Sequence, residues 1–322
     1  MNAAAKDISR TRAWLIATRP HTLPAGASPV IVGAGLGLHQ GVFEPLPALA
    51  ALVGALLIQI GANLANDYYD AVKGVDSEQT EGYTRVTESG LIEPGRVRAA
   101  MWATFGLAIL VGVYLVYVGG LPILAVGLLG IASGIAYAGG PYPLGSHGLG
   151  DLFVFVWFGV IAVIGTYYVQ AAAHVGGAGF LFPDATTPEL VPLVAVIASL
   201  PAAGLTTNIL VVNNVRDLEA DRKAGKYTLA VLIGSRWSRI EYLAMLGLAS
   251  LAPVALWLGW EGFGPAVLLP LVTIPFAAVI ARTVLTETGE EALNPALERT
   301  GQLLAAHSVL FAIGLVLSAG VV

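Results

Sequence analysis

Runs of about twenty uncharged, mostly apolar residues recur along the whole chain, and a run of that length lets an α-helix cross the hydrocarbon core of a bilayer. One run, LPALAALVGALLIQIGANLA, ends directly in NDYYDAVKGVD, which contains three aspartates. Only 11% of the 322 residues are charged and 56% are hydrophobic, whereas roughly a quarter of a soluble domain is charged. These features predict an all-α, polytopic membrane protein rather than a soluble domain with a very large core.

The apolar runs predict nine transmembrane helices, at about residues 22–39, 45–66, 98–118, 121–139, 151–173, 189–213, 239–259, 264–281 and 301–321. We expect them to surround a central cavity and to form a single domain over residues 1–322. The N-terminus does not resemble a signal peptide, because its short apolar run is interrupted at Arg19 and Pro20. Residues 1–20 are therefore expected to be a cytoplasmic N-terminal segment.

The positive charges indicate the orientation of this bundle. All sixteen Lys and Arg fall in loops on one side of the nine spans, and the opposite loops carry none. By the positive-inside rule that side is cytoplasmic, so the N-terminus is expected inside and the C-terminus outside the plasma membrane. The cations do not gather into a nucleic-acid-binding stripe. The chain has no cysteine, which excludes disulfides, thiolate metal ligands and thiol nucleophiles.

A second acidic stretch, NNVRDLEADRKAGK, repeats the pattern of the first. Asn66 and Asn213 are 147 residues apart, as are Asp70 and Asp217, and four predicted spans separate the copies. This spacing predicts two pseudo-repeated four-helix halves with the same orientation, plus a ninth helix. Residues i and i+4 share a helix face, so Asn66 with Asp70, and Asn213 with Asp217 and Asp221, should form two oxygen-rich rows at the cytoplasmic side.

Opposed rows of oxygen ligands beside basic loops suit a metal bound to phosphate. Mg²⁺ takes few carboxylates and commonly completes its coordination with substrate phosphates. Nearby cations suit the remaining phosphate oxygens; they are Lys73, Arg85, Arg216 and Lys226. The alternative is that the acids are ordinary solvated helix ends, but two clusters in register argue against it. A substrate with a diphosphate head and a long apolar tail fits this arrangement.

At these residues the chain resembles the UbiA superfamily of intramembrane aromatic prenyltransferases. The matching segments, in chain order, are RPHTLPA, NDYYDAVKGVD, GLGDLFVFVWFGVIAVIGTYYVQ and NNVRDLEADRKAGKYTLAVLIG. The paired aspartate motifs are typical of the superfamily. The GLGD, GTYYVQ and TLAV portions are most similar to the 1,4-dihydroxy-2-naphthoate polyprenyltransferases of menaquinone synthesis.

The resemblance implies Mg²⁺-dependent transfer of a polyprenyl group from polyprenyl diphosphate to 1,4-dihydroxy-2-naphthoate within membrane lipid. Diphosphate and CO₂ would leave, giving demethylmenaquinol. By residue match, Mg²⁺–diphosphate binding falls to Asn66, Asp70, Asp76, Asp217 and Asp221, with Asp67 and Asn213 as further candidates. Catalysis would rest on Asp70, Asp217, Lys73 and Arg85, with Lys226 also holding diphosphate oxygens.

The chain departs from the family pattern after the first motif. Gly74 stands where the plainer pattern has its third acid, and Asp76 serves instead, as the naphthoate branch spaces it. The following segment, GYTRVTESG, carries Val86, Glu88 and Ser89 where Gly, Gln and a cation are common. These departures bear on the acceptor and on diphosphate handling rather than on the class of reaction.

Further candidates come from the first span and from aromatic residues. Arg19 and His21 would hold the acceptor's carboxylate or help its hydroxyl ionise; the alternative is a cytoplasmic anchor. Tyr137, Tyr142 and Tyr168 would shield an allylic cation with their ring faces; the alternative is helix packing. Asp151 is read either as a helix N-cap or as a substrate residue.

Two alternative functions remain open. One is a UbiA-type transferase with another acceptor, such as homogentisate, 4-hydroxybenzoate or a glycerol lipid. The other is a secondary transporter, since transporters also use repeats and intramembrane acids. A transporter predicts acids near the bilayer midplane, whereas here they cluster at one end.

Overall fold

The computed structural model describes residues 8–73, 86–87, 89–138, 143–178, 181–183 and 190–319, with all side chains except those of Asp70, Lys73, Gly134, Ile135 and Ala138. In these ranges the chain is helical apart from turns and one isolated bridge, which confirms the all-α prediction. The α-helices are α1 (Arg10–Ala17), α2 (Leu23–His39), α3 (Pro45–Lys73), α4 (Pro94–Ala138), α5 (Gly150–Val154), α6 (Ala162–His174), α8 (Leu193–Arg216), α9 (Leu218–Lys223), α10 (Leu229–Gly259), α11 (Ile274–Thr286) and α12 (Glu290–Ser318). A π-helix (Phe155–Ile161) joins α5 to α6, and 3₁₀ segments lie at Pro20–Thr22, Leu144–Ser146 and Pro265–Thr273.

Seven helical stretches among the described residues are long and apolar enough to cross a membrane. They are Pro45–Tyr69, Pro94–Ser133, Gly150–His174, Leu193–Arg216, Leu229–Gly259, Pro265–Thr286 and Glu290–Ser318. The sequence predicted nine spans. The difference arises because α2 has only 17 residues and because α4 joins two predicted spans into one stretch. The count of nine and the internal repeat therefore stay predictions.

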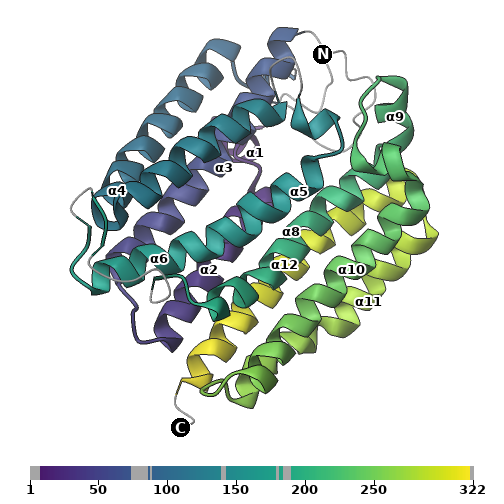
Figure 1. Ribbon diagram of the computed structural model, residues 1–322. Coiled ribbons are helices and arrows are strands. Elements are labelled where there is room, and N and C mark those ends of the chain that lie inside the picture. Colours follow the sequence, from purple (N-terminus) through teal and green to yellow (C-terminus); the bar gives the residue numbers. More distant parts are fainter. Residues whose placement is uncertain are drawn as a thin grey trace.

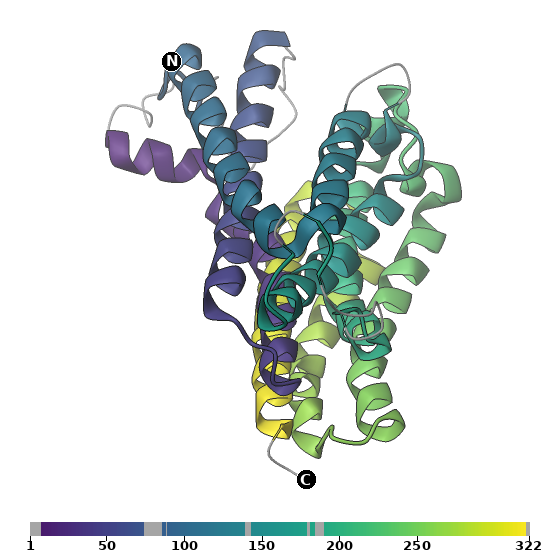
Figure 2. The ribbon, with the colours of Figure 1, turned by 60° about the vertical axis from the view of Figure 1, so that its left-hand side comes forward.

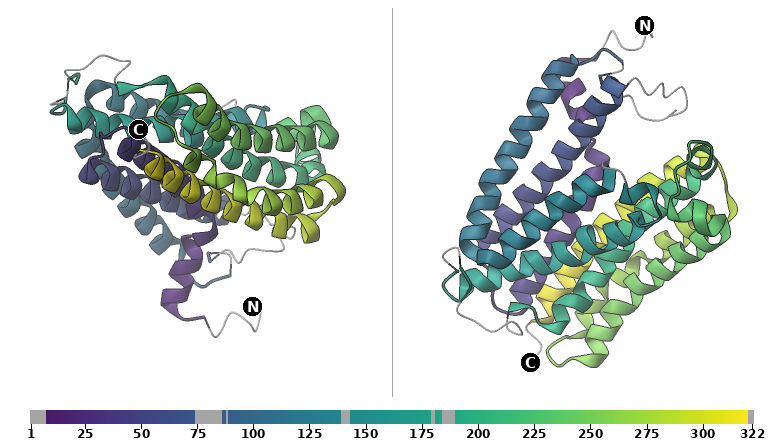
Figure 3. Two further views of the ribbon diagram at one scale, coloured as in Figure 1. Left: turned by 90° about the horizontal axis from the view of Figure 1, so that it is seen from below. Right: turned by 45° about the horizontal axis from the view of Figure 1, so that its top comes forward.

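Gly120 divides α4 into two helical halves. Its φ of 72° lies in the left-handed region, which glycine adopts without strain. The turn is tied to a neighbouring loop: the backbone N–H of Leu121 donates to the carbonyl of Leu181 (2.7 Å), and that of Ala178 donates to the carbonyl of Val118 (2.9 Å). The two halves run in opposite directions from this turn (Figure 3, right). They correspond to the spans predicted at 98–118 and 121–139.

The helices form two groups joined through α2. This helix packs against α3, α6, α8 and α12. On one side α3 pairs with α4, and on the other α8 pairs with α10 and α12. The two groups diverge toward the end of the molecule that carries the N-terminus, and the C-terminus lies at the opposite end (Figure 2).

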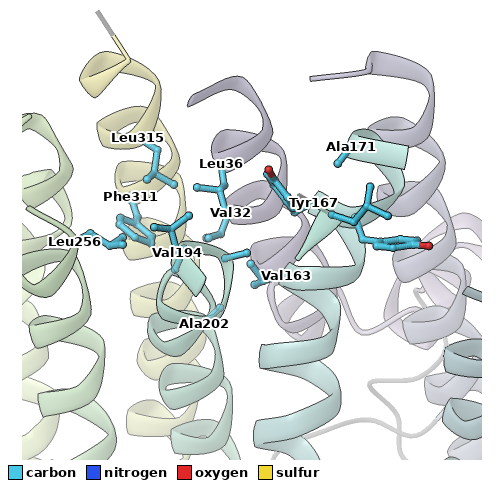
Figure 4. Packing of buried hydrophobic residues seen from close by; sticks show 14 of the residues in the cluster. Val32, Leu36, Val163, Tyr167, Ala171, Val194, Ala202, Leu256, Phe311 and Leu315 are labelled. Carbon is cyan, nitrogen blue, oxygen red and sulfur yellow. The ribbon is translucent and has the colours of Figure 1, made fainter. Parts of the chain in front are cut away.

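The main hydrophobic core lies where these groups meet. Val32 and Leu36 of α2 pack with Val163 and Tyr167 of α6 and with Phe311 of α12 (Figure 4). Lipid is as apolar as these side chains, so helix association in a membrane depends on close packing, which small residues favour. α8 is the most buried of the seven spans, and its buried face carries four fully buried alanines: Ala195, Ala198, Ala202 and Ala203. The helix that carries the second acidic stretch is therefore fixed by packing.

Candidate active site

Both acidic stretches lie at the end of the bundle that carries the N-terminus (Figure 1). Residues 66–73 of the first form the last turns of α3, and the second spans the end of α8 and the short helix α9. They belong to the two different helix groups. The predicted placement of both stretches at one end of the bundle is thus seen in the fold.

The second stretch keeps helical hydrogen bonding from α8 into α9. The N–H of Asp217 donates to the carbonyl of Asn213 (3.0 Å), and the N–H of Asp221 donates to the carbonyl of Asp217 (2.8 Å). These i to i+4 bonds agree with the predicted grouping of the three residues. Asp217, with φ −92° and ψ 5°, ends α8 and precedes α9, so the row runs across the junction of two helices, and its metal-binding role stays a prediction.

Asp217 is held by its neighbour Arg216. Nε of Arg216 donates to Oδ1 of Asp217 (2.7 Å) and Nη2 donates to Oδ2 (2.8 Å), the two-pronged arrangement that makes arginine–carboxylate pairs specific. The side chains of Arg216 and Asp217 are 10% and 27% exposed, so the pair is largely shielded from solvent. The sequence placed Arg216 among the phosphate-binding cations, whereas its guanidinium is directed at the acid beside it.

Asp221 and Lys226 form a second pair on the same stretch. Nζ of Lys226 donates to Oδ1 of Asp221 (3.1 Å). The other oxygen of Asp221, Oδ2, is buried and accepts no hydrogen bond from the described groups. Buried carboxylate oxygens are normally satisfied, so this atom has capacity for a cation or an ordered water. Lys226 is 44% exposed, which leaves its ammonium accessible to a substrate phosphate.

Two adjacent polar residues of the first stretch lie in different environments. Asn66 is exposed, whereas Asp67 is 3% exposed. The carboxylate of Asp67 accepts hydrogen bonds from the hydroxyl of Thr87 and, at 3.3 Å, from the backbone N–H of Thr87. Asp67 thus ties the end of α3 to Thr87, and the metal-binding role considered for it stays a prediction. Sequence reasoning missed Thr87.

The unusual Val86 has a packing explanation. It is 1% exposed and belongs to a small core with Leu64 of α3 and with Val97 and Met101 of α4. An apolar side chain at this point anchors the loop on the helices beside it. The structure describes only the backbone of Asp70 and Lys73, and Asp76, Arg85 and Glu88 lie outside the described residues.

The loop before α5 contacts the second acidic stretch. The N–H of Tyr227 donates to the carbonyl of Ser146 (3.0 Å), next to the bridge between His147 and Tyr227. At the other side of this loop, Tyr137 packs against Phe153, with ring centroids 4.9 Å apart. The half-buried ring of Tyr137 therefore lies at the acidic end of the bundle, where a role in shielding a cation was predicted. Tyr142 lies outside the described residues.

Asp151 is not the N-cap of α5. Leu149 occupies that position, and Asp151 lies inside the first turn. Its side chain is 4% exposed, and its Oδ2 accepts no hydrogen bond from the described groups. Tyr137 and Glu241 of α10 are its electrostatic neighbours. The N-cap interpretation was wrong, and the alternative role toward substrate stays a prediction.

Arg19 and His21 lie in a strained link between α1 and α2. Arg19 has a φ of 47°, the one positive φ of a non-glycine residue in the described part of the chain, and such strain persists only where surrounding contacts impose it. Asn63 of α3 supplies them, because its Nδ2 donates to the carbonyl of Thr18 (2.9 Å) and to the hydroxyl of Thr22 (2.8 Å). The link is thereby fixed one helical turn from the first acidic stretch.

Burial lowers the pKa of His21, and the positive charge of Arg19 lowers it further, against an opposing effect of Glu298. A lowered pKa makes the imidazole neutral at neutral pH, so it can accept a proton. The backbone carbonyl of His21 also faces Gly301 of α12. One helix, α12, thus borders this link and, at Asn294, the second acidic stretch.

Tyr168 lies at the far end of the bundle. It is buried, and its hydroxyl donates to the carbonyl of Gly119 (2.9 Å), at the turn that divides α4. Since α4 begins at Pro94 beside the acidic end, at 1.5 Å per residue this turn lies about 37 Å along the helix. The structure does not bring Tyr168 to the other predicted site residues, and helix packing is its role.

Leucine substitutions at Tyr168 and at Tyr137 test the different roles expected of the two tyrosines. We expect Tyr168→Leu to lower the melting temperature in detergent, because it removes a buried ring and its hydrogen bond, and to leave kcat/KM within about twofold of wild type. Tyr137→Leu should lower kcat about tenfold if its ring faces a developing cation. Loss of turnover in Tyr168→Leu with an unchanged melting temperature would contradict this placement.

The described residues carry chemical groups that bind a hard divalent cation, but they do not form a complete metal site. The donors are carboxylate and amide oxygens, one of them the unsatisfied Oδ2 of Asp221, and these are ligands that Mg²⁺ accepts. Among side chains the structure describes, no three of the His, Asp and Glu residues lie together as a metal site. A complete site would need the first stretch, including Asp70 and Asp76.

The fold is that of a multi-pass helical membrane protein with two acidic stretches at one end. The chain matches the UbiA prenyltransferase family over residues 27–295 and belongs to that family. It is therefore a prenyltransferase and an integral membrane protein.

Relatives agree with the resemblance drawn from the motifs. The chain is 38% identical to the 1,4-dihydroxy-2-naphthoate octaprenyltransferase of Escherichia coli (strain K12), over 97% of this chain and 98% of that protein. It is 34% identical to the protein of the same name from Mycobacterium tuberculosis, over 89% and 91% of the two chains. It is 30% identical to human UbiA prenyltransferase domain-containing protein 1, over 95% and 83%.

Solved structures share the fold. An apo UbiA homologue from Aeropyrum pernix K1 superposes with a TM-score of 0.64 at 15% identity, over 91% of this chain and 97% of that one. A UbiA homologue from Archaeoglobus fulgidus bound to DMAPP and Mg²⁺ gives a TM-score of 0.56 at 16% identity, over 93% and 99%.

Proposed function

We propose that this prenyltransferase moves a polyprenyl group from polyprenyl diphosphate to 1,4-dihydroxy-2-naphthoate with Mg²⁺, releasing diphosphate and CO₂ and forming demethylmenaquinol. The observation that carries the proposal is the oxygen row of Asn213, Asp217 and Asp221 at the end of a buried span. Relatives named for the naphthoate reaction support the acceptor, and the Archaeoglobus homologue bound to DMAPP and Mg²⁺ supports the donor and the metal.

Mg²⁺ would supply a Lewis acid that neutralises charge on the departing diphosphate. The residues proposed to hold it are Asn66, Asp70, Asp76, Asp217 and Asp221. The accessible ammonium of Lys226 would bind diphosphate oxygens beside Asp221, with Lys73 and Arg85 doing so from the first stretch. The assignments of Asp70, Lys73, Asp76 and Arg85 rest on the sequence motif.

The acceptor is proposed to lie near the strained link between α1 and α2. Arg19 would hold its carboxylate, and neutral His21 would accept a proton from its hydroxyl, which raises the electron density of the ring. The allylic C–O bond breaks with its electron pair going to diphosphate, and a ring carbon supplies the pair for the new C–C bond. When that carbon carries the carboxylate, loss of CO₂ returns an electron pair and restores the aromatic ring. Tyr137 would shield the allylic cation, and Tyr142 would do the same by sequence position.

The orientation proposed from the charges places this chemistry at the cytoplasmic face of the plasma membrane. All sixteen Lys and Arg lie in the loops on one side of the predicted spans. The N-terminus would be inside and the C-terminus outside, which agrees with their opposite positions in the fold (Figure 1).

The proposal is tested by an assay in membranes that contain the full-length protein. Geranylgeranyl diphosphate and 1,4-dihydroxy-2-naphthoate are supplied with Mg²⁺ or with EDTA, and the products are identified by mass spectrometry. We expect a prenylated naphthol that lacks the carboxylate, formed only with Mg²⁺ and restored when Mg²⁺ replaces EDTA. The matched control is the same membrane preparation without the protein.

Three other results would each reject one part of the proposal. Diphosphate release with homogentisate, 4-hydroxybenzoate or a glycerol lipid, but not with the naphthoate, would keep prenyl transfer and reject the acceptor. A product that retains the carboxylate would reject the decarboxylation. Full activity in EDTA would reject the metal.

A further inference from the structure

Arg216 connects three residues from two helices at the second acidic stretch. Besides its two bonds to Asp217, Nη2 donates to Oδ1 of Asn213 (2.8 Å) and Nη1 donates to Oδ1 of Asn294 (2.8 Å). Asn294 lies in α12, 78 residues along the chain. The guanidinium thus contacts Asp217, a proposed metal ligand, Asn213, a further candidate for that role, and Asn294, which no motif includes.

Through these contacts the guanidinium of Arg216 is hydrogen-bonded to other protein groups. Nε and both terminal nitrogens donate to protein oxygens, and the side chain is 10% exposed. The planar fork fixes the plane of the Asp217 carboxylate. Each carboxylate oxygen has two lone pairs, so the fork leaves acceptor capacity on Asp217 for a cation while it prevents the side chain from rotating.

Asn294 is itself held in place by packing. Its neighbours Leu293 and Ala296 are buried in the core that α12 shares with Val212 and Val215 of α8. The amide oxygen of Asn294 is thereby placed against Nη1 of Arg216. Removal of that oxygen would take away this contact between the guanidinium and α12.

The geometry points to Asn294 and Arg216 as positioning residues, which hold Asn213 and Asp217 in the orientation that binds the divalent cation. This inference rests on the proposed function and assigns Arg216 a task different from that of Lys226. Ligating carboxylates in metal sites are commonly oriented by such outer hydrogen bonds, and loss of these bonds typically lowers metal affinity by about 10–100-fold. The competing role is a direct contact from Arg216 to the substrate diphosphate.

The test measures metal affinity without substrate. Full-length protein in nanodiscs is titrated with Mn²⁺, and free Mn²⁺ is followed by EPR. We expect Asn294→Ala and Arg216→Lys each to weaken binding about tenfold, because the first removes the anchor and the second keeps the charge but loses the fork. Asn294→Gln keeps a neutral acceptor oxygen and should recover most of the affinity.

Matched controls exclude a general effect of substitution. Arg222→Lys alters an exposed pair with Glu219 on α9, and Gln302→Ala alters an exposed side chain on α12; both should bind Mn²⁺ like the wild type. Melting temperatures in detergent identify variants that fail to fold. A folded Asn294→Ala protein with unchanged Mn²⁺ affinity would overturn the inference.

Kinetics separate positioning from phosphate binding. If Arg216 orients ligands, Arg216→Lys and Asn294→Ala both raise the Mg²⁺ concentration needed for half-maximal rate, and saturating Mg²⁺ restores most of kcat. If Arg216 binds diphosphate, Arg216→Lys alone raises KM for the prenyl diphosphate at saturating Mg²⁺, and positioning is rejected. Asp217→Ala serves as the reference: Mn²⁺ affinity unaffected by it would reject the metal site itself, whereas a strong effect of Asp217→Ala with none from Asn294→Ala rejects only the positioning role.

Discussion

Asp217→Ala is expected to lower kcat/KM for prenyl transfer at least about 10³-fold, equivalent to roughly 4 kcal/mol of transition-state stabilisation. The substitution removes a carboxylate from the proposed metal site. It also leaves the guanidinium of Arg216, which is 10% exposed, without its two-pronged partner. Both effects act where negative charge builds up on the departing diphosphate. The measurement is initial product formation at several prenyl diphosphate concentrations, quantified by mass spectrometry.

The matched control for Asp217→Ala is Glu219→Ala. Glu219 lies two residues further along, 69% exposed, and pairs with Arg222 at the surface. Such exposed pairs contribute little, so kcat/KM should stay within about twofold of wild type. A folded Asp217→Ala protein that retained more than a tenth of wild-type kcat/KM would show that the second acidic stretch does not carry the reaction.

The parts of this site that follow from local sequence could be predicted. Helical periodicity places Asn213, Asp217 and Asp221 at successive turns, and i to i+4 backbone bonds link them across the junction of α8 and α9. The all-helical fold follows in the same way, because each apolar run is long enough to satisfy its own backbone in lipid. The spacing of the two stretches likewise placed them at one end of the bundle (Figure 1).

The parts that depend on contacts between distant segments could not be predicted. Asn294 matters because α12 packs beside α8, and nothing in its local sequence marks it. Thr87 bonds Asp67, which lies 20 positions earlier in the chain. Tyr168 could be assigned either to a cation site or to a helix contact, because an aromatic side chain fits both and sequence does not give its depth in the bundle. Arg216 has the charge that phosphate binding needs, but its partners are decided by packing.

Gly159→Ala is expected to give a large loss of stability at a position away from the acidic stretches. Gly159 lies in the π-helix, where α8 approaches so closely that an added Cβ would clash with Cα of Ala203. The contact is with backbone, so a rotamer change cannot relieve it and the helices must separate. Overpacking of this kind costs about 1–3 kcal/mol or more. We expect the melting temperature in detergent to fall by about 5 °C or more, with reduced turnover because α8 carries Asn213 and Asp217.

Two further variants show whether the backbone contact is the cause. Gly165→Ala lies in the same span, where an added Cβ meets nothing within 4 Å, so the higher helix propensity of alanine should leave stability unchanged or slightly raised. Combining Gly159→Ala with Ala203→Gly removes the Cβ of Ala203 but not its Cα, so stability should recover only in part. Full recovery in the double variant would mean that the side chain of Ala203, rather than the path of α8, sets the packing at this point. In that case the position of the second acidic stretch would not depend on how closely α8 approaches the π-helix.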